Sequence, residues 1–400
     1  MQSSVGTVEQ RQDARRQTDL LFEILDPSAI YARPIGERHR TIFYIGHLEA
    51  FDWNQLWRLS AGRPSFHPEF DRLFEAGIDP PLGELPADVP ADWPNREAVN
   101  DYVSRIREEI DRHWDEFPLN RRQMVIEHRH MHAETLAYML HNLPHGAKVR
   151  NFADREVSVR DSTQEWMPIP AGRATLGQDA AGGEFGWDNE FNTTRVDVPA
   201  FRMQKFKISN GDWLKFMEAT GAAPPHFWVN HRGEWHFRGM FESIPLPLDW
   251  PVWTTLDQAR KFAAWAGYAL PTEAQYHRAA FGRPDGSEAE QVTPANCGYE
   301  RWNPEPVNAR PESASAFGVE QLVGNGWEWT QTPFAPLDGF APHDYYPGYS
   351  ANFFDDKHFV LKGGSPRTAF NLTRRSLRNW FRPDYPYLYA GFRLVENSPR

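Results

Sequence analysis

A run of histidines near residue 130 carries the clearest chemistry in this sequence. The segment reads Glu127-His128-Arg129-His130-Met131-His132-Ala133-Glu134. His128 and His132 are four residues apart, and on a helix this spacing places two imidazoles one turn apart on the same face. Two such imidazoles can bind one metal ion, as they do in a His-Glu-x-x-His helix. A solvated pair or a pair packed in the core is the competing interpretation.

A third ligand is available earlier in the chain. His47 lies in the middle of an apolar helical stretch. A core histidine held by one hydrogen bond would explain it, but a bundle can direct side chains from facing helices to one interior point. Glu134 could orient a ligand histidine by a hydrogen bond. Glu49 and Asp52 are alternatives for that role, or simply surface charges. Spacing does not choose the metal, because imidazole suits zinc, iron and copper.

Helical periodicity over the first part of the chain must position these histidines. Helices of this length joined by loops predict an antiparallel four-helix bundle. The longest connection, 62–95, is rich in proline and aspartate. The predicted helices cover residues 8–25, 36–60, 96–114 and 120–143.

The second part of the chain has a different character. From about Met167, glycine, proline and tryptophan become frequent and helical stretches are few. Helices are expected at 209–220 and 255–266, each after a residue suited to cap it, Ser209 and Thr255. The pattern predicts a loop-rich α+β domain in which large aromatic side chains fill the core. We therefore predict two domains, 1–156 and 157–400.

Composition limits the function classes. The 400 residues carry a formal net charge of −11, which argues against a general nucleic-acid or anionic-membrane binder. No apolar run suggests an export signal or a membrane span, so a cytoplasmic protein is expected. The single cysteine, Cys297, excludes a disulfide framework and a cysteine-rich metal site. Any metal must then be held by His, Asp or Glu, and the sequence leaves the oligomeric state open.

These motifs resemble a known family. His47 in a Gly-His-x-x-x-Phe context, followed by His128-x-x-x-His132-x-Glu134, resembles the N-terminal DinB-like bundle of ergothioneine-type sulfoxide synthases. The second part resembles their C-type-lectin-like, formylglycine-generating-enzyme-like (sulfatase-modifying-factor) domain. Its matching pieces, in family order, are Ile169-Pro170-Ala171-Gly172, Phe185-Gly186-Trp187-Asp188-Asn189-Glu190, Ile208-Ser209-Asn210-Gly211, Leu270-Pro271-Thr272-Glu273-Ala274, Gly324-Asn325-Gly326-Trp327-Glu328-Trp329-Thr330, Leu361-Lys362-Gly363-Gly364-Ser365, Arg378-Asn379-Trp380-Phe381-Arg382-Pro383 and Gly391-Phe392-Arg393-Leu394.

The resemblance implies a non-haem iron(II) enzyme that uses dioxygen as co-substrate. Members join a sulfur donor to the imidazole of hercynine, which is trimethylated histidine, and form a sulfoxide. A close branch, the selenoneine synthases, uses a selenosugar and forms a carbon–selenium bond. By motif match, His47, His128 and His132 would be the iron ligands. The partners implied are thus small molecules, with no nucleic acid and no membrane.

The resemblance also assigns substrate contacts. The C-terminal Arg-Asn-Trp segment of the family binds substrate, which carries over to Asn379 and Trp380. The branch that uses γ-glutamylcysteine has an acidic residue where this chain has Phe381, and a glutamine where it has Met131. Both departures favour a selenosugar, or alternatively cysteine, over γ-glutamylcysteine. Arg382 could pair with a carboxylate of the substrate or form an ordinary surface ion pair.

The family also uses a tyrosine near the iron as a proton donor. The candidates here are Tyr345, Tyr346 and Tyr349, in the loop before residues 359–365. Trp327 and Trp329 are expected to belong to the core, and Asn325 and Glu328 to be structural.

Three rival functions are weaker. A formylglycine-type oxidase would need thiols, and Cys297 lies outside the segments expected to form its site. The three-histidine pattern argues against a non-catalytic binding module. The large second domain argues against a zinc-dependent thiol transferase, which normally consists of the bundle alone.

Overall fold

The computed structural model describes residues 6–75, 85–150, 152–155, 157–160 and 163–397. Contacts divide the chain into two compact units, Met1–Phe152 and Ala153–Arg400. The first is helical, and the described part of the second is built from short strands, three α-helices, short 3-10 turns and long irregular segments. No helix in the described part of the chain combines the length and the apolar character needed to cross a bilayer.

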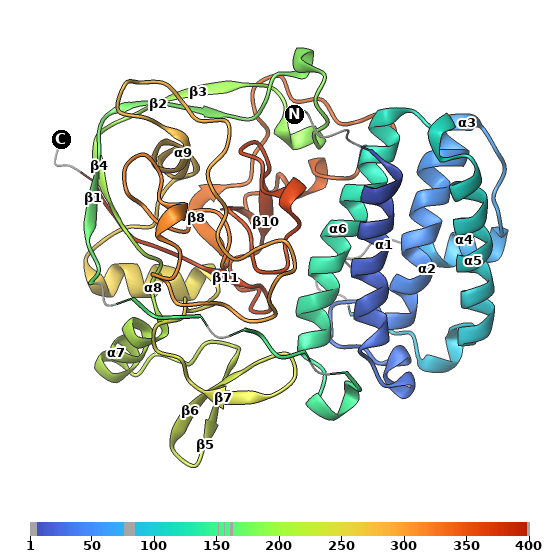
Figure 1. Ribbon diagram of the computed structural model, residues 1–400, viewed down its shortest axis with the longest axis horizontal. Coiled ribbons are helices and arrows are strands. Elements are labelled where there is room, and N and C mark those ends of the chain that lie inside the picture. The colour runs from blue at the N-terminus through green and yellow to red at the C-terminus, as the bar shows by residue number, and fades with distance from the viewer. Residues whose placement is uncertain (1–5, 76–84, 151, 156, 161–162, 398–400) are drawn as a thin grey trace. The chain divides into compact units, whose positions relative to one another are not determined.

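Four long helices make up most of the first unit, and they lie side by side in Figure 1. Helix α1 packs on α6, while α2 packs on α5, on α6 and on the short helix α4. Capping side chains fix where two of these helices begin. The Thr7 side chain caps the N-terminus of α1, and the Asn95 side chain caps that of α5. The helices are α1 (Val8–Glu23), α2 (Thr41–Trp53), α3 (Leu59–Ala61), α4 (Pro68–Glu75), α5 (Arg96–Arg112) and α6 (Leu119–His141).

Two features of this unit differ from the prediction. Helix α2 begins at Thr41 rather than near residue 36, since a 3-10 turn, Pro27–Tyr31, and the Pro34–Gly36 segment precede it. Helix α4 lies within the 62–95 connection, where no helix was predicted. Its Phe74 ring is fully buried against α2 at Gly46, where a Cβ atom would come within 2.4 Å of the ring. The glycine thus allows α4 to approach α2 closely.

Helix α2 is buried on every side. Each residue from Thr41 to Trp53 is buried, including the polar His47, Glu49 and Asp52. A helix that is enclosed in this way must satisfy its polar groups with protein partners. The expectation that Glu49 and Asp52 could be surface charges is therefore wrong.

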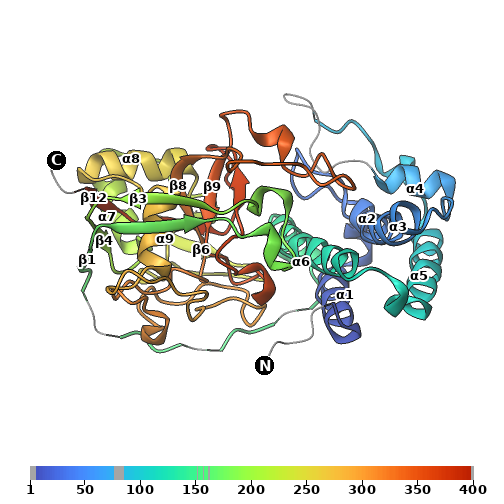
Figure 2. The same ribbon diagram turned by 90° about the horizontal axis from the view of Figure 1, so that it is seen from above.

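The described part of the second unit contains four small sheets. Their strand orders are β1-β4-β12, β10-β9-β8-β11, β2-β3 and β5-β6-β7. Among the strand pairs that the structure describes, only β8 with β11 is parallel and the others are antiparallel. Figure 2 shows β1, β4 and β12 together at one end of the unit. The strands are β1 (Trp166–Ile169), β2 (Gly172–Leu176), β3 (Thr194–Val198), β4 (Phe201–Gln204), β5 (Trp228–His231), β6 (Glu234–Arg238), β7 (Ser243–Pro245), β8 (Trp327–Pro333), β9 (Phe359–Lys362), β10 (Asn379–Phe381), β11 (Ala390–Gly391) and β12 (Val395–Asn397).

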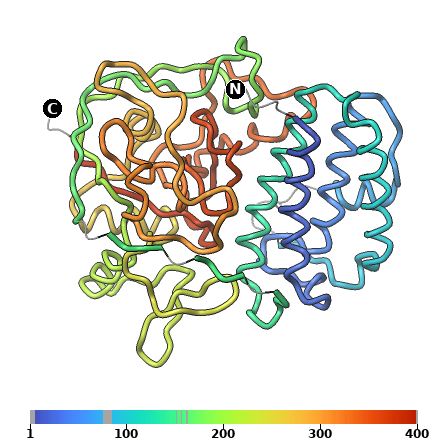
Figure 3. Tube along the Cα trace, viewed as in Figure 1, coloured from blue at the N-terminus to red at the C-terminus, as the bar shows by residue number. Residues whose placement is uncertain are grey.

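The two helices predicted for this unit are confirmed as α7 (Asn210–Thr220) and α8 (Leu256–Ala266), with Ser209 and Thr255 as their caps. A further helix, α9 (Glu273–Phe281), follows a third cap of the same kind, Thr272, and was missed. The trace in Figure 3 shows how much of the unit between α9 and β8 is irregular chain.

Large aromatic rings and buried ion pairs hold this loop-rich unit together. Trp327 and Trp329 are buried, as predicted for core residues. Glu328 lies between them in the sequence and bonds to Lys207 and Arg393, all three being fully buried. The predicted structural role of Glu328 is confirmed, because its carboxylate is closed to solvent and bonds to two buried cationic side chains.

Candidate metal centre

Three histidines from two helices meet inside the first unit. His47 comes from α2, and His128 and His132 come from α6. One nitrogen of each ring lies within 4.8 Å of a nitrogen of the other two. The Nε2 atoms of His128 and His132 are 3.1 Å apart. All three side chains are buried, so the cluster is held by the protein and screened from bulk water.

The orientation of His47 is set by a backbone carbonyl. Its Nδ1 lies 2.7 Å from the carbonyl oxygen of Phe74 on α4. Because a carbonyl only accepts, Nδ1 carries the proton and Nε2 presents a lone pair. Metal-binding histidines commonly use their second nitrogen in this way. The sequence carried no sign of this contact, since any residue at position 74 would offer the same carbonyl.

Packing orients the other two rings. The Phe51 ring stacks on His128 at 3.5 Å between centroids, and the Tyr44 ring lies 5.9 Å from that of His132. The Nδ1 atoms of both histidines are buried and lack a hydrogen-bond partner among the described residues. Glu134 is half-buried and makes no bond to either Nδ1. That Glu134 orients a ligand histidine stays a prediction, and such a contact would not be made to these two Nδ1 atoms.

Burial keeps the three imidazoles neutral. It lowers the pKa of His47 to about 4 and the pKa values of His128 and His132 well below the ordinary value. The positive charge of Arg129 contributes to the lowering for each of them. A neutral imidazole is the form that binds a metal, so the cluster is ready to act as a ligand set at pH 7 without losing protons.

The separation of the two α6 histidine nitrogens fits a transition metal. Two nitrogens bound to one ion at about 2.1 Å would lie about 3.0–3.4 Å apart, and the measured separation of 3.1 Å falls in that range. Three imidazoles suit iron, zinc or copper and leave positions for other ligands. A hydrogen bond between His128 and His132 would give the same separation, and metal titration distinguishes the two.

In the second unit, Trp380 lies in an aromatic cluster. Its ring stacks on Phe334 at 4.3 Å and nearly parallel, with Tyr349 edge-on at 5.3 Å and Phe353 at 5.6 Å. Trp187 in turn stacks on Tyr349 at 4.2 Å. Trp380 itself remains half-buried. The residue is thus not fully enclosed, and the position of its ring is fixed by neighbouring rings.

The two neighbours of Trp380 on β10 point to the opposite face of the strand. Strand β10 contains Asn379, Trp380 and Phe381, and alternate side chains of a strand point to opposite faces. Phe381 stacks on Tyr385 at 5.1 Å, away from the Trp380 cluster. The Asn379 Oδ1 accepts a bond from the backbone N–H of Trp380. The predicted substrate contacts of β10 therefore do not all lie on one face.

Arg382 and Met131 complete the predicted contacts. Arg382 follows β10 and is half-buried. Met131 belongs to α6 in the first unit, next to His132, and is also half-buried.

The three candidate tyrosines have different surroundings. Tyr349 contacts Trp380, as described above. Tyr346 lies near Asp188, and burial together with this carboxylate raises its pKa to about 12. Tyr345 stacks on His343 at 4.9 Å. Tyr349 is thus the candidate with a described ring contact to Trp380.

Comparison with known proteins identifies related sequences. Residues 151–398 match the sulfatase-modifying factor enzyme 1-like domain family. The chain is 33% identical over 391 residues to the hercynine oxygenase of Mycolicibacterium thermoresistibile, covering 86% of this chain and 85% of the relative. It is 26% identical over 490 residues to ergothioneine biosynthesis protein 1 of Neurospora crassa, covering 94% of this chain and 56% of that protein.

The formylglycine-generating enzyme of Mus musculus is 28% identical over 216 residues, covering 41% of this chain and 57% of the enzyme. The similarity to the Mycolicibacterium protein covers more of the chain than the matched domain does, so it extends into the helical unit.

Proposed function

Because this chain belongs to the hercynine oxygenase family and carries a sulfatase-modifying factor enzyme 1-like domain, we propose that it uses iron(II) and dioxygen to form a carbon–chalcogen bond on the imidazole of hercynine. The observation that carries the proposal is the buried three-histidine cluster in a chain of this family. With a thiol donor, hercynine and the thiol each lose one hydrogen. One oxygen atom enters the sulfoxide and the other leaves as water.

His47, His128 and His132 are the proposed ligands, and the first unit is proposed to be a DinB-like bundle. Non-haem iron(II) supplies one-electron and dioxygen chemistry when bound. The protein supplies three neutral imidazoles in a buried place, with His47 held in one tautomer by the Phe74 carbonyl. Zinc would suit the same ligands but lacks redox chemistry, so the family relationship favours iron.

Trp380 is proposed to bind the trimethylammonium group of hercynine. This cation has no hydrogen-bond donor, so it is held by aromatic faces rather than by acceptors. The half-buried Trp380 ring, fixed by Phe334 and Tyr349, offers such a surface. Tyr349 is the preferred proton donor of the three tyrosines because it contacts Trp380.

The proposed donor is a selenosugar, with cysteine as the alternative. The position that is acidic in the γ-glutamylcysteine branch holds Phe381 here, stacked on Tyr385. An aromatic pair presents no carboxylate to the ammonium group of an amino-acid donor, and it can pack against the apolar face of a sugar. Asn379, Arg382 and Met131 are proposed to line the donor and hercynine sites. We further propose that the enzyme works in the cytoplasm.

A donor competition tests this function. The protein is loaded anaerobically with iron(II), then given hercynine and oxygen with a selenosugar, cysteine or γ-glutamylcysteine, and the products are identified by mass spectrometry. A carbon–selenium product supports the proposed donor, and a sulfoxide from cysteine supports the alternative. His128→Ala is the control and should lose both iron and turnover. Full iron loading and turnover in that variant would refute the ligand assignment.

A further inference from the structure

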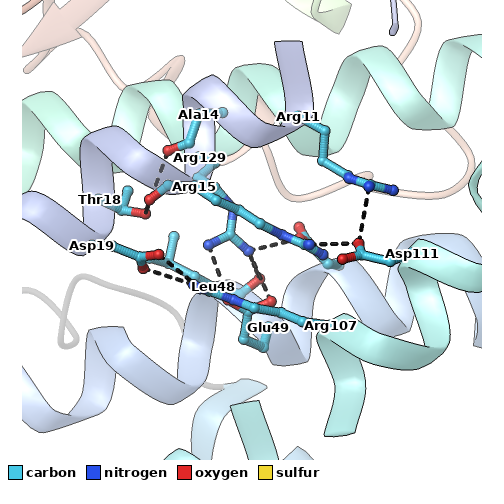
Figure 4. Close-up of polar contacts among 11 residues, drawn as sticks. Arg11, Ala14, Arg15, Thr18, Asp19, Leu48, Glu49, Arg107, Asp111 and Arg129 are labelled. Carbon is cyan, nitrogen blue, oxygen red and sulfur yellow. Dashed lines mark hydrogen bonds and ion pairs between the residues drawn. The ribbon is translucent and has the colours of Figure 1, made fainter. Parts of the chain in front are cut away.

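A buried arginine links the two helices that carry the histidines. Arg129 follows His128 on α6 and is only 2% exposed. Its guanidinium donates to Glu49 Oε1 at 3.0 Å and to Asp52 Oδ2 at 2.7 Å, both on α2. It also donates to the carbonyl of Leu48, at 3.3 Å. Figure 4 shows this guanidinium directed at Glu49 and Leu48, the two residues that follow His47.

The contacts extend to the other two long helices. Arg107 on α5 donates from Nε to the Glu49 carboxylate at 2.8 Å. Its two terminal nitrogens each donate to the carboxylate of Asp19 on α1, at 2.7 Å. Arg15 on α1 pairs in turn with Asp111 on α5 at 2.5 Å. One connected set of charges therefore joins α1, α2, α5 and α6, as Figure 4 shows.

Stability alone does not account well for these charges. Moving carboxylates and a guanidinium out of water is costly, and buried pairs often contribute less than apolar side chains of the same size. Their best-supported benefit is to specify one register between packed elements. A guanidinium suits this task because its planar fork can hold two carboxylates in fixed directions, which an ammonium group cannot do.

The position of the pairs relates them to the histidines. Arg129 is adjacent to His128 in the chain, and Glu49 is two residues from His47. A slide or rotation of α6 along α2 would separate His47 from the α6 histidines and would also break the bonds of Arg129. Both sets of contacts thus depend on the same register.

We propose that Arg129, held by Glu49 and Asp52, is the positioning residue that sets the register of α2 and α6 and so brings His47 to His128 and His132. The inference rests on the proposed metal centre. The described bonds of Arg129 go to Glu49, Asp52 and the Leu48 carbonyl, and its proposed role is to place the ligands.

The test is metal affinity in a variant that keeps the charge. Arg129→Lys retains one cation but cannot hold both carboxylates in the same way. The full-length protein is titrated anaerobically with cobalt(II), whose absorption bands report the ligand geometry. We expect an unchanged helical circular dichroism spectrum, a cobalt dissociation constant raised about 10–100-fold, and altered bands.

Arg40→Lys is the matched control. Arg40 precedes α2 and pairs with Asp88 at 2.8 Å, but that pair does not join α2 to α6. This variant should bind cobalt as the wild type does. If Arg129→Lys binds with wild-type affinity and bands, or if Arg40→Lys loses as much affinity, the positioning role is refuted.

A substitute variant and the behaviour of the wild type distinguish failure of the positioning role from failure of the metal centre. If Arg129→Lys does not fold, Asp52→Asn provides the same test, because it keeps the shape of the side chain while weakening one arm of the fork. Wild-type protein that binds no cobalt, or binds it equally after His128→Ala, would refute the metal centre and the inference with it. Wild-type binding with no effect of the Arg129 and Asp52 variants would refute only the inference.

Discussion

The packing of Phe74 on Gly46 leads to a quantitative prediction for Gly46→Ala. An added Cβ would lie 2.4 Å from Cδ2 and Cε2 of the Phe74 ring and 2.5 Å from its Cγ. Carbon atoms pack at about 3.5–4.0 Å, so the ring must retreat by about 1 Å or more. Trp93, Phe70 and Tyr102 surround that ring, with centroids 5.6–6.3 Å away. The ring therefore has little room to move unless α4 moves with it.

Two energies oppose each other in this variant. Overpacking a filled core costs about 1–3 kcal/mol. Alanine is a better helix former than glycine by about 0.8–1.0 kcal/mol, which offsets part of that cost. We expect the free energy of unfolding to fall by about 1–2 kcal/mol. Because α4 also carries the carbonyl that orients His47, we expect metal affinity to fall about 10–100-fold.

Urea unfolding and anaerobic cobalt titration measure the two effects. Gly146→Ala is the control, since a Cβ there would meet no atom within 4 Å. Phe74→Leu removes the ring, so adding Gly46→Ala in that background should be neutral or stabilising by up to about 1 kcal/mol. The reasoning is refuted if Gly46→Ala alone is as stable as the wild type and binds cobalt as tightly.

Three other predictions follow from the structure. Burial holds the pKa of His47 and of His130 at about 4, so below pH 6.5 the unfolded chain takes up protons that the folded chain does not. The metal-free protein should keep its free energy of unfolding above that pH and lose up to about 3 kcal/mol per ring on approaching pH 4, as urea titrations across this range would show. Stability that is unchanged between these limits would contradict the assigned burial. Trp380→Ala should raise the hercynine KM roughly tenfold while leaving iron loading intact, and unchanged hercynine kinetics would remove Trp380 from the site. Cys297→Ala should leave turnover nearly unchanged, because the proposed chemistry uses no enzyme thiol, whereas an inactive variant would favour a thiol-dependent oxidase.

Much of the local structure could be predicted from the sequence. The periodicity of α1, α5 and α6 located these helices to within about three residues, and the caps Ser209 and Thr255 located α7 and α8. Such signals are local, since helix periodicity and capping involve residues at most a few positions apart. The same locality explains why α4 was missed, because its eight residues lie in a connection rich in proline and aspartate.

The candidate site could be predicted only in part. The spacing of His128 and His132 places them on one helix face. The apolar helical stretch around His47, which is 81 residues before His128, made it a candidate third ligand, and the family resemblance assigned it that role. The residues around them had no such signal. From the sequence, Glu49 and Asp52 could be surface charges or could orient a ligand histidine. Only the packing of α2 shows that they are buried partners of Arg129.

The sequence by itself determined the long helices α1, α5 and α6, the chemical types of the three candidate ligands and the family to which the motifs belong. These depend on residue identity and on spacing along the chain. Tertiary structure alone decided that the Phe74 carbonyl orients His47, that Glu134 does not bond to the Nδ1 of either α6 histidine, and that Tyr349 contacts Trp380. Such contacts join atoms that are far apart in sequence, and they depend on how closely helices and loops pack, which no local pattern encodes.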